Sequence, residues 1–359
     1  MESSPPGRRR SVLKLVFSIG LGAALLVLVF RGVELDRFVA AIRGVRASWL
    51  LAVVALSSAM HLIRCWRWGL IIGRVQPVPF REVVSISSVG LLALQVLPFR
   101  LGEVVRPYLL VERRGLRFGA ALYTVVLERT TEIVGLAGAF TVAVLFADLP
   151  LDNLQLGDWD VSFVADGRRA IGLALTPFLL CLAAFLFLGD RIAGPVEAAA
   201  IRVHRGLGRA LGGLLRSFAE GAATMRDGRF SLAILATTAL AWTLNAGVFW
   251  ATARAFGFDI EPLAGVVLLV VFMVGMLLPA PPLFAGVFEA FLIAGVALYG
   301  VERSDAAAYA VVSHVAQLGI VMAWALPFLW LDRLSFAAFR RFVDGLRTGE
   351  ASVGEGAER

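Results

Sequence analysis

The sequence is poor in cysteine, in lysine and in charge. Its two cysteines, Cys65 and Cys181, lie in apolar runs and lack the spacing of a zinc site or a disulfide framework. Lys14 is the only lysine, so nearly all basic side chains are arginines. No GxSxG, GxxxxGK[ST] or HExxH pattern is present, which excludes these hydrolase, P-loop and zinc-protease signatures. We therefore expect no metal site and no cofactor.

The low charge content also excludes a soluble domain. Of the 359 residues, 17% are charged and 59% are hydrophobic, and several apolar runs reach the roughly 20 residues that cross a bilayer. The formal net charge of +7 comes from arginines in short stretches between these runs. Positive-inside topology and anionic headgroups explain that distribution better than nucleic-acid binding, for which no basic face interleaved with aromatics is present.

The apolar runs predict six complete membrane-spanning helices. Each run is predominantly apolar and compatible with a helix. The predicted spans are residues 12–30, 48–70, 118–147, 170–189, 231–256 and 306–331.

Two further apolar pieces are predicted to be broken or re-entrant helices. The first runs from residue 83 and stops at Pro98, after which a helix can restart near Gly102. The second breaks between Pro279 and Pro282 and resumes near Gly286. Because proline removes a backbone donor and strains a helix, such breaks at membrane depth are expected to line protein or water rather than lipid.

The spacing of these breaks predicts an internal repeat. Pro98 follows Trp49 by 49 residues (98 − 49), and Pro279 follows Phe230 by 49 residues (279 − 230). Each interval holds one span and one broken segment. The predicted fold is an all-α polytopic membrane protein, with about six complete transmembrane helices and two broken or re-entrant helical hairpins in an inverted repeat, as in many secondary transporters.

Loop charge orients this fold. Arginine-rich residues 100–117 and 191–229 are placed in the cytoplasm and the aspartate-rich residues 148–168 outside. Residues 31–47 fit poorly, because they hold four arginines and must also lie outside. The predicted segments are a basic cytoplasmic tail (1–11), a first membrane half (12–147), an acidic external loop (148–168), a second membrane half (169–331) with a basic cytoplasmic loop (190–229), and a cytoplasmic C-terminal tail (332–359).

Charged residues within the membrane part are the candidates for substrate binding or coupling, because a charge near the bilayer centre costs on the order of 2.5–3.5 kcal/mol. They are Arg64, Arg67, Arg100, Glu103, Arg106, Glu128, Arg129, Glu132, Glu289 and His314. Glu128 and Glu132 share one helical face and require a cation, a proton or an arginine between them.

Purely structural explanations remain open for these residues. Arg129 and Glu132 can form an ordinary pair between helices, and Glu103 can be a surface residue. Arg64 and Arg67 can snorkel from a helix end toward the membrane surface. If helices restart near Gly102 and Gly286, their free amide groups can also receive a phosphate.

Three stretches resemble the lysylphosphatidylglycerol synthase transmembrane family, the flippase-like domain. They are residues 61–68 (HLIRCWRW), 97–107 (LPFRLGEVVRP) and 127–129 (LER), and the resemblance extends over residues 12–331. The family's P-x-x-P-G-G-x-G-x-x-E pattern is matched by Pro279, Pro282, Gly286 and Glu289. Leu283 and Phe284 replace its paired glycines, which makes the second hairpin bulkier.

The resemblance implies a protein of the cytoplasmic (inner) membrane of a bacterium or archaeon. The distribution of basic residues predicts that both termini lie in the cytoplasm. The resemblance also implies translocation of lipids, or their supply to envelope synthesis, as the membrane half of the multiple peptide resistance factor does with aminoacylated phosphatidylglycerol. Family members attached to a synthase carry a soluble transferase domain after the spans. This chain is expected to act alone or with a separately encoded envelope biosynthesis enzyme.

Three functions are consistent with the sequence. The first is a flippase-like carrier for a lipid with a charged headgroup, of phospholipid, aminoacyl-phospholipid or polyprenyl-phosphate type, and not an enzyme. The second is a membrane glycosyltransferase or accessory subunit that uses polyprenyl-phosphate donors, with Asp158 and Asp160 holding a metal. The third is a non-catalytic scaffold for an envelope synthase.

Overall fold

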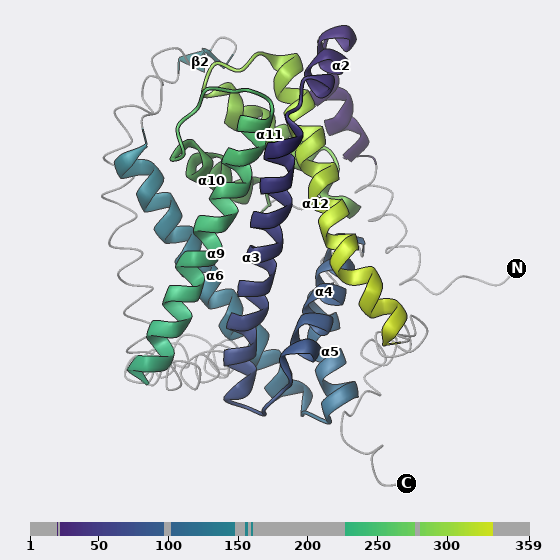
Figure 1. Ribbon diagram of the computed structural model, residues 1–359, viewed down its shortest axis with the longest axis vertical. Helices are drawn as coiled ribbons and strands as arrows, with labels where there is room; N and C mark the ends of the chain where they lie inside the picture. Colours follow the sequence, from purple (N-terminus) through teal and green to yellow (C-terminus); the bar gives the residue numbers. More distant parts are fainter. Residues whose placement is uncertain are drawn as a thin grey trace, which may run out of the picture.

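The computed structural model describes residue 20 and residues 22–96, 102–147, 155–156, 159–160, 227–276 and 281–332. Residues 22–30 are helical, and the elements that follow are α2 (Leu35–Arg43), α3 (Ala47–Gly73), α4 (Phe80–Val96), α5 (Gly102–Arg114), α6 (Phe118–Phe146), β1 (Gln155–Leu156), β2 (Trp159–Asp160), α9 (Gly228–Ala255), α10 (Ala264–Met276), η3 (Pro282–Phe284), α11 (Val287–Ala297) and α12 (Arg303–Leu331). Figure 1 shows the long helices running along one axis, with shorter helices at both ends.

Four of the described helices, α3, α6, α9 and α12, are long and apolar enough to cross a membrane. They confirm the predicted spans 48–70, 118–147, 231–256 and 306–331 to within three residues at each end. Side-chain caps define two of their starts: Asp227 accepts hydrogen bonds from the first amides of α9, and Glu302 from an amide of α12. The predicted all-α polytopic membrane fold is confirmed. Residues 12–19 and the predicted span 170–189 lie outside the described residues.

The first predicted broken helix is a hairpin of two short helices, α4 and α5, which pack against each other. Gly102 makes this contact possible, because a Cβ there would lie 2.3 Å from the Cα of Leu94 in α4. The break itself, residues 97–101 with Pro98, lies outside the described residues.

The second broken helix is a hairpin of α10 and α11, joined through η3. Leu283 and Phe284 have φ angles of 61° and 58°, in the left-handed region that favours glycine. These are the two positions at which the family pattern has its paired glycines. Gly286 (φ 84°) caps α11, and a Cβ there would lie 2.8 Å from the carbonyl oxygen of Gly22. The first helix therefore packs closely on this hairpin; Pro279 lies outside the described residues.

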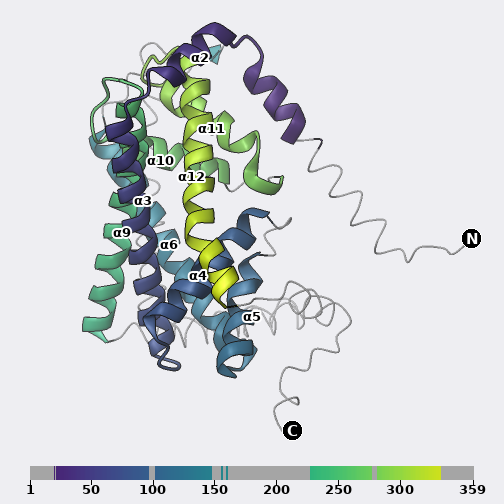
Figure 2. The ribbon, with the colours of Figure 1, turned by 45° about the vertical axis from the view of Figure 1, so that its right-hand side comes forward.

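The packing follows an inverted repeat. The described helices occur twice in the order long, short, short, long, and the two halves contact each other through α3 and α9. Each hairpin packs on the last long helix of the other half, α4 on α12 and α10 on α6. Each half also has its own apolar core. Figures 1 and 2 show α4 and α5 at one end of the molecule and α10 and α11 at the other, so the hairpins enter from opposite sides.

Arginines in residues 31–47 are accommodated by a surface helix. None of the residues of α2 is buried, and this helix packs on α12 at the end of the molecule where the second hairpin enters. Arg37 lies 3.6 Å from Glu302 at the start of α12. Arg37 thus has a local counter-charge at the start of α12.

Asp332, just after α12, ties this helix to the first hairpin. Its carboxylate accepts hydrogen bonds from Ser85 in α4 and from Arg81, and it lies 3.0 Å from Arg113 in α5. Burial opposes ionisation of the carboxyl, but the Ser85 hydrogen bond and the Arg113 charge outweigh it and lower the pKa of Asp332. This contact closes one end of the interface between α12 and the first hairpin.

Candidate functional site

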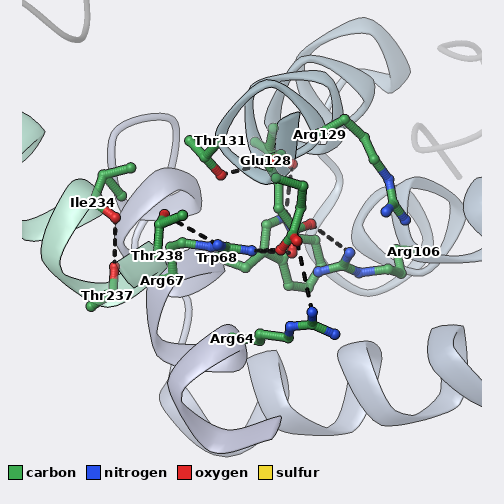
Figure 3. Close-up of polar contacts among 12 residues, drawn as sticks. Arg64, Arg67, Trp68, Arg106, Glu128, Arg129, Thr131, Ile234, Thr237 and Thr238 are labelled. Atoms are coloured by element: carbon green, nitrogen blue, oxygen red, sulfur yellow. Dashed lines mark hydrogen bonds and ion pairs between the residues drawn. The ribbon is translucent and has the colours of Figure 1, made fainter. Parts of the chain in front are cut away.

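Seven of the predicted site residues lie together, within α3 and α6 and at the start of α5. We call them the charged cluster: Arg64, Arg67, Glu103, Arg106, Glu128, Arg129 and Glu132. Its centre is the pair Glu128 and Glu132, one turn apart on α6. As their spacing required, arginines from two other helices neutralise them: Arg67 lies against both carboxylates, and Arg106 contacts Glu128. Figure 3 shows Arg67 and Arg106 approaching Glu128.

Arg67 binds both of these glutamates from within the core. Its side chain is 0% exposed, it donates a hydrogen bond to Glu132, and it lies 3.7 Å from Glu128. It also donates to the hydroxyl of Thr238 in α9, at 3.2 Å. Arg67 therefore does not snorkel to the membrane surface, and it links the first half of the repeat to the second.

Arg106 neutralises Glu128 from the first hairpin. Its Nη1 donates to Glu128 Oε2 at 2.5 Å, and its guanidinium lies 3.9 Å from the centre of the Trp68 ring. Gly90 in α4 leaves room for the stem of this arginine, because a Cβ there would lie 2.3 Å from Arg106 Cγ. The hairpin, the aromatic ring and the carboxylate together fix the position of the charge.

Arg64 and Arg129 are held less tightly. Arg64 lies 3.7 Å from Glu132 and Arg129 lies 3.7 Å from Glu103, distances too long for hydrogen bonds. Their side chains are 28% and 44% exposed, in contrast with that of Arg67. The structure pairs Arg129 with Glu103 and Glu132 with Arg67, so the alternative of a direct Arg129–Glu132 pair is not what forms.

A cavity of about 320 Å³ lies between the two halves of the repeat. One side is formed by members of the charged cluster, namely Arg64, Glu103, Arg106, Glu128, Arg129 and Glu132. The other side comes from α9, the second hairpin and α12 and is mainly apolar, including Phe249, Phe272, Met276, Phe284, Phe288 and Trp324. The cavity thus has its charged residues at the first half and most of its aromatic residues at the second. Its volume is within the size range of small-molecule sites (about 300–1,000 Å³).

Glu289 and His314 form a separate pair in the second half. Glu289 Oε1 lies 2.6 Å from His314 Nδ1, and Oε2 accepts a hydrogen bond from the amide of Gly286. The Phe288 ring stacks on the imidazole at 4.1 Å. Glu289 thus caps the restarted helix α11, and neither residue of the pair lines the cavity. Arg100, the remaining predicted residue, lies outside the described residues.

Sequence reasoning missed several polar residues that line the cavity. His61 accompanies the arginines on α3, and its Nε2 lies 2.8 Å from Ser88 Oγ. Asn245 on α9 and Gln317 on α12 are polar residues in otherwise apolar spans. That isolation within apolar runs was a usable signal, because polar side chains at membrane depth mark functional positions.

The family model described as the lysylphosphatidylglycerol synthase TM region matches residues 11–325. The chain belongs to this family. No curated protein matches the chain. The family match confirms the resemblance carried by residues 61–68, 97–107 and 127–129, and it connects this multi-pass membrane protein with membrane lipids.

One feature of this member of the lysylphosphatidylglycerol synthase TM family is the left-handed backbone of Leu283 and Phe284, two residues that both carry side chains. Phe284 also lines the cavity. The glycosyltransferase alternative places a metal on Asp158 and Asp160. Asp158 lies outside the described residues, and Asp160 is the last residue of β2, which pairs with β1 in a two-residue ribbon.

Proposed function

We propose that this protein is a flippase-like carrier that moves a lipid with a charged headgroup across the cytoplasmic membrane. The observation that carries this proposal is the amphipathic cavity between the two halves of the repeat. A headgroup fits against the charged cluster, and the first part of an acyl or prenyl chain fits against the aromatic side. A cavity of about 320 Å³ holds a headgroup rather than a whole lipid, so the remaining chain stays in the bilayer.

The charges support a functional role, because their burial is costly. Seven ionised side chains gather in the membrane part of the chain, and stability alone is served as well by apolar packing. Two of them, Arg64 and Arg129, lack hydrogen-bonded contact with the carboxylates nearest to them. Such groups are suited to a ligand that arrives and leaves.

The inverted repeat supplies a route for alternating access. The hairpins enter from opposite ends, and each packs on a long helix of the other half. Transporters built in this way bind substrate at the repeat interface and open it to either side by rocking one unit against the other. At one end, the contact of Asp332 with Ser85 and Arg113 holds the first hairpin against α12. We infer that this contact breaks when the cavity opens to that side, which we place in the cytoplasm with both termini.

The test is transbilayer movement of phospholipids carrying a headgroup label, measured in proteoliposomes against protein-free vesicles. The wild type is expected to move labelled lipid, and Arg106→Gln is expected to reduce the rate at least about tenfold because Glu128 loses its hydrogen-bonded counter-charge. Arg74→Gln is the matched control, because Arg74 directly follows α3 and forms a half-exposed pair with Asp227. A wild type that moves no lipid of any headgroup class would contradict the proposal.

A further inference from the structure

We infer that Arg64 and Arg129 form a binding site for a phosphate ester, and that Glu103 is a built-in counter-ion that this anion displaces. The inference rests on the proposed function and names its substrate class: an anionic phosphate lipid without a cationic group in its head. The inference concerns binding of the lipid and not its movement, so it can be tested separately from transport.

The charge balance of the cluster favours an anion. Four arginines face three glutamates, which leaves a net charge of +1 (4 − 3). Two of the arginines are hydrogen-bonded directly to two of the glutamates: Arg67 to Glu132 and Arg106 to Glu128. What remains is Arg64 and Arg129 against the single carboxylate of Glu103.

The contacts of the two remaining arginines are long and open to the cavity. Arg64 lies 3.7 Å from Glu132 and Arg129 lies 3.7 Å from Glu103, both beyond hydrogen-bond distance. Arg64 Nε is buried and has no hydrogen-bond partner among the described residues. Figure 3 shows Arg64 and Arg129 reaching the cluster from different helices, with the Arg106 guanidinium between theirs in this view. Guanidinium groups present paired donors that match the oxygens of a phosphate. A bound phosphate would therefore accept the hydrogen bonds from Arg64 and Arg129 that the glutamates lie too far away to accept.

Glu103 has the placement of a displaceable counter-ion. It lies in the first turn of α5, at the positive end of that helix, and its side chain is 32% exposed. Both Glu103 and Arg129 line the cavity, so a ligand can reach the gap between them. A phosphate that binds Arg129 takes the position of the carboxylate, and Glu103 then competes with the ligand rather than assisting it.

This geometry discriminates among headgroups. A headgroup that carries only phosphate brings negative charge to two cations, whereas a choline headgroup also places a quaternary ammonium near Arg64 and Arg129. Like charges in such a site disfavour binding. The apolar wall formed by Phe272, Met276 and Phe288 adds affinity for a hydrocarbon chain, which a free phosphate ion cannot use.

The experiment measures equilibrium binding to the full chain in detergent micelles. The probes are acyl-labelled phosphatidic acid, acyl-labelled phosphatidylcholine, and inorganic phosphate as a competitor. Phosphatidic acid is expected to bind at least about tenfold more tightly than phosphatidylcholine, and Arg64→Gln and Arg129→Gln are each expected to weaken its binding about tenfold. Glu103→Gln is expected to strengthen binding severalfold. Competition by inorganic phosphate at comparable concentration would identify a free anion as the ligand, and failure to compete would identify the lipid.

The sign of the Glu103→Gln effect separates a ligand site from a structural ion pair. In a structural pair, removing either partner disturbs the site, so Glu103→Gln and Arg129→Gln would weaken binding alike. That result, or unchanged binding by both arginine variants, would overturn the inference. Arg254→Gln is the matched control, since its side chain is 29% exposed, it pairs with Asp259 at 2.7 Å, and it does not line the cavity.

Folding defects and transport defects can be told apart from loss of the site. Arg129→Lys keeps a positive charge and is expected to retain part of the affinity that Arg129→Gln loses, which a misfolded variant would not do. Lipid movement that persists without headgroup preference in Arg64→Gln and Arg129→Gln would overturn the phosphate site alone. Selective binding of phosphatidic acid without movement would contradict the carrier and leave the site standing.

Discussion

Replacing Arg67 with methionine tests whether the centre of the charged cluster is a buried ion-pair network. Arg67 has no exposed side-chain surface, and it contacts Glu128, Glu132 and Thr238. Methionine keeps much of the length and the apolar stem but removes the charge and its donors. Glu132 then loses its hydrogen-bonded cation and keeps, among the described residues, the longer ion pair with Arg64 at 3.7 Å.

Removing one partner of a buried pair leaves an uncompensated charge, which typically costs about 3–5 kcal/mol. We therefore expect Arg67→Met to lower the free energy of unfolding by about that amount. The exposed pair of Arg74 and Asp227, whose side chains are 42% and 44% exposed, provides a control at the end of the same helix. Arg74→Met should cost less than about 1 kcal/mol.

A second variant restores the charge balance. Arg67→Met combined with Glu132→Gln removes one positive and one negative charge, so it should recover about 1–3 kcal/mol of the loss, the range for residues in one network. The assay is unfolding of the purified protein in mixed micelles of rising SDS content, followed by circular dichroism. If Arg67→Met equals Arg74→Met in stability, or if the double variant is less stable than Arg67→Met, the reasoning is refuted.

Three further predictions concern the hairpins and the end of α12. Gly102→Ala should destabilise the protein by about 1–3 kcal/mol in the same unfolding assay, because the added Cβ would meet the backbone of α4. The control is Gly138→Ala on α6: the space around Gly138 is open, so this change should be neutral or stabilising by up to about 1 kcal/mol. Leu283→Gly should raise stability by up to about 1 kcal/mol, since relief of a left-handed backbone (about 1–2 kcal/mol) exceeds the entropy cost of glycine (about 0.5–1 kcal/mol); a clear loss would contradict this. The pKa of Asp332 is lowered by folding, so its contribution is present above the ordinary pKa of about 3.9 and is lost as the pH falls below it. Wild type and Asp332→Asn should therefore differ in thermal unfolding midpoint at neutral pH and converge in acid, whereas a pH-independent difference would argue against the ion pair.

The long spans and the hairpin breaks could be predicted because both leave local signals in the sequence. Apolar runs gave the ends of α3, α6, α9 and α12 to within three residues. Clustered proline and glycine marked the two hairpins, and equal spacing indicated the repeat. The 25 residues from Glu103 to Glu128 and from Glu289 to His314 are equal as well, but the two pairs make different contacts.

The partners within the site could not be predicted, because they depend on how helices pack. Arg67 lies near a helix end in sequence, yet packing of α3 against α6 and α9 buries it completely. The role of Gly90 as the space for Arg106 leaves no local signal, since a glycine in an apolar helix has many uses. The positive φ at Leu283 could not be predicted from the leucine itself, because leucine normally adopts the β or right-handed helical region. The sequence hint is that the family pattern has a glycine at this position.

The most direct test of the account asks whether a lipid headgroup passes through the cavity between the halves. Gln317 lines the cavity on α12, whereas Val315 on the same helix is 63% exposed outside it. Transbilayer movement of headgroup-labelled phosphatidic acid should be measured in proteoliposomes with Gln317→Trp and with Val315→Trp. We predict that Gln317→Trp slows movement at least about tenfold, in line with a blocked cavity, and that Val315→Trp moves lipid at the wild-type rate. Equal rates in the two variants would contradict a path through this cavity.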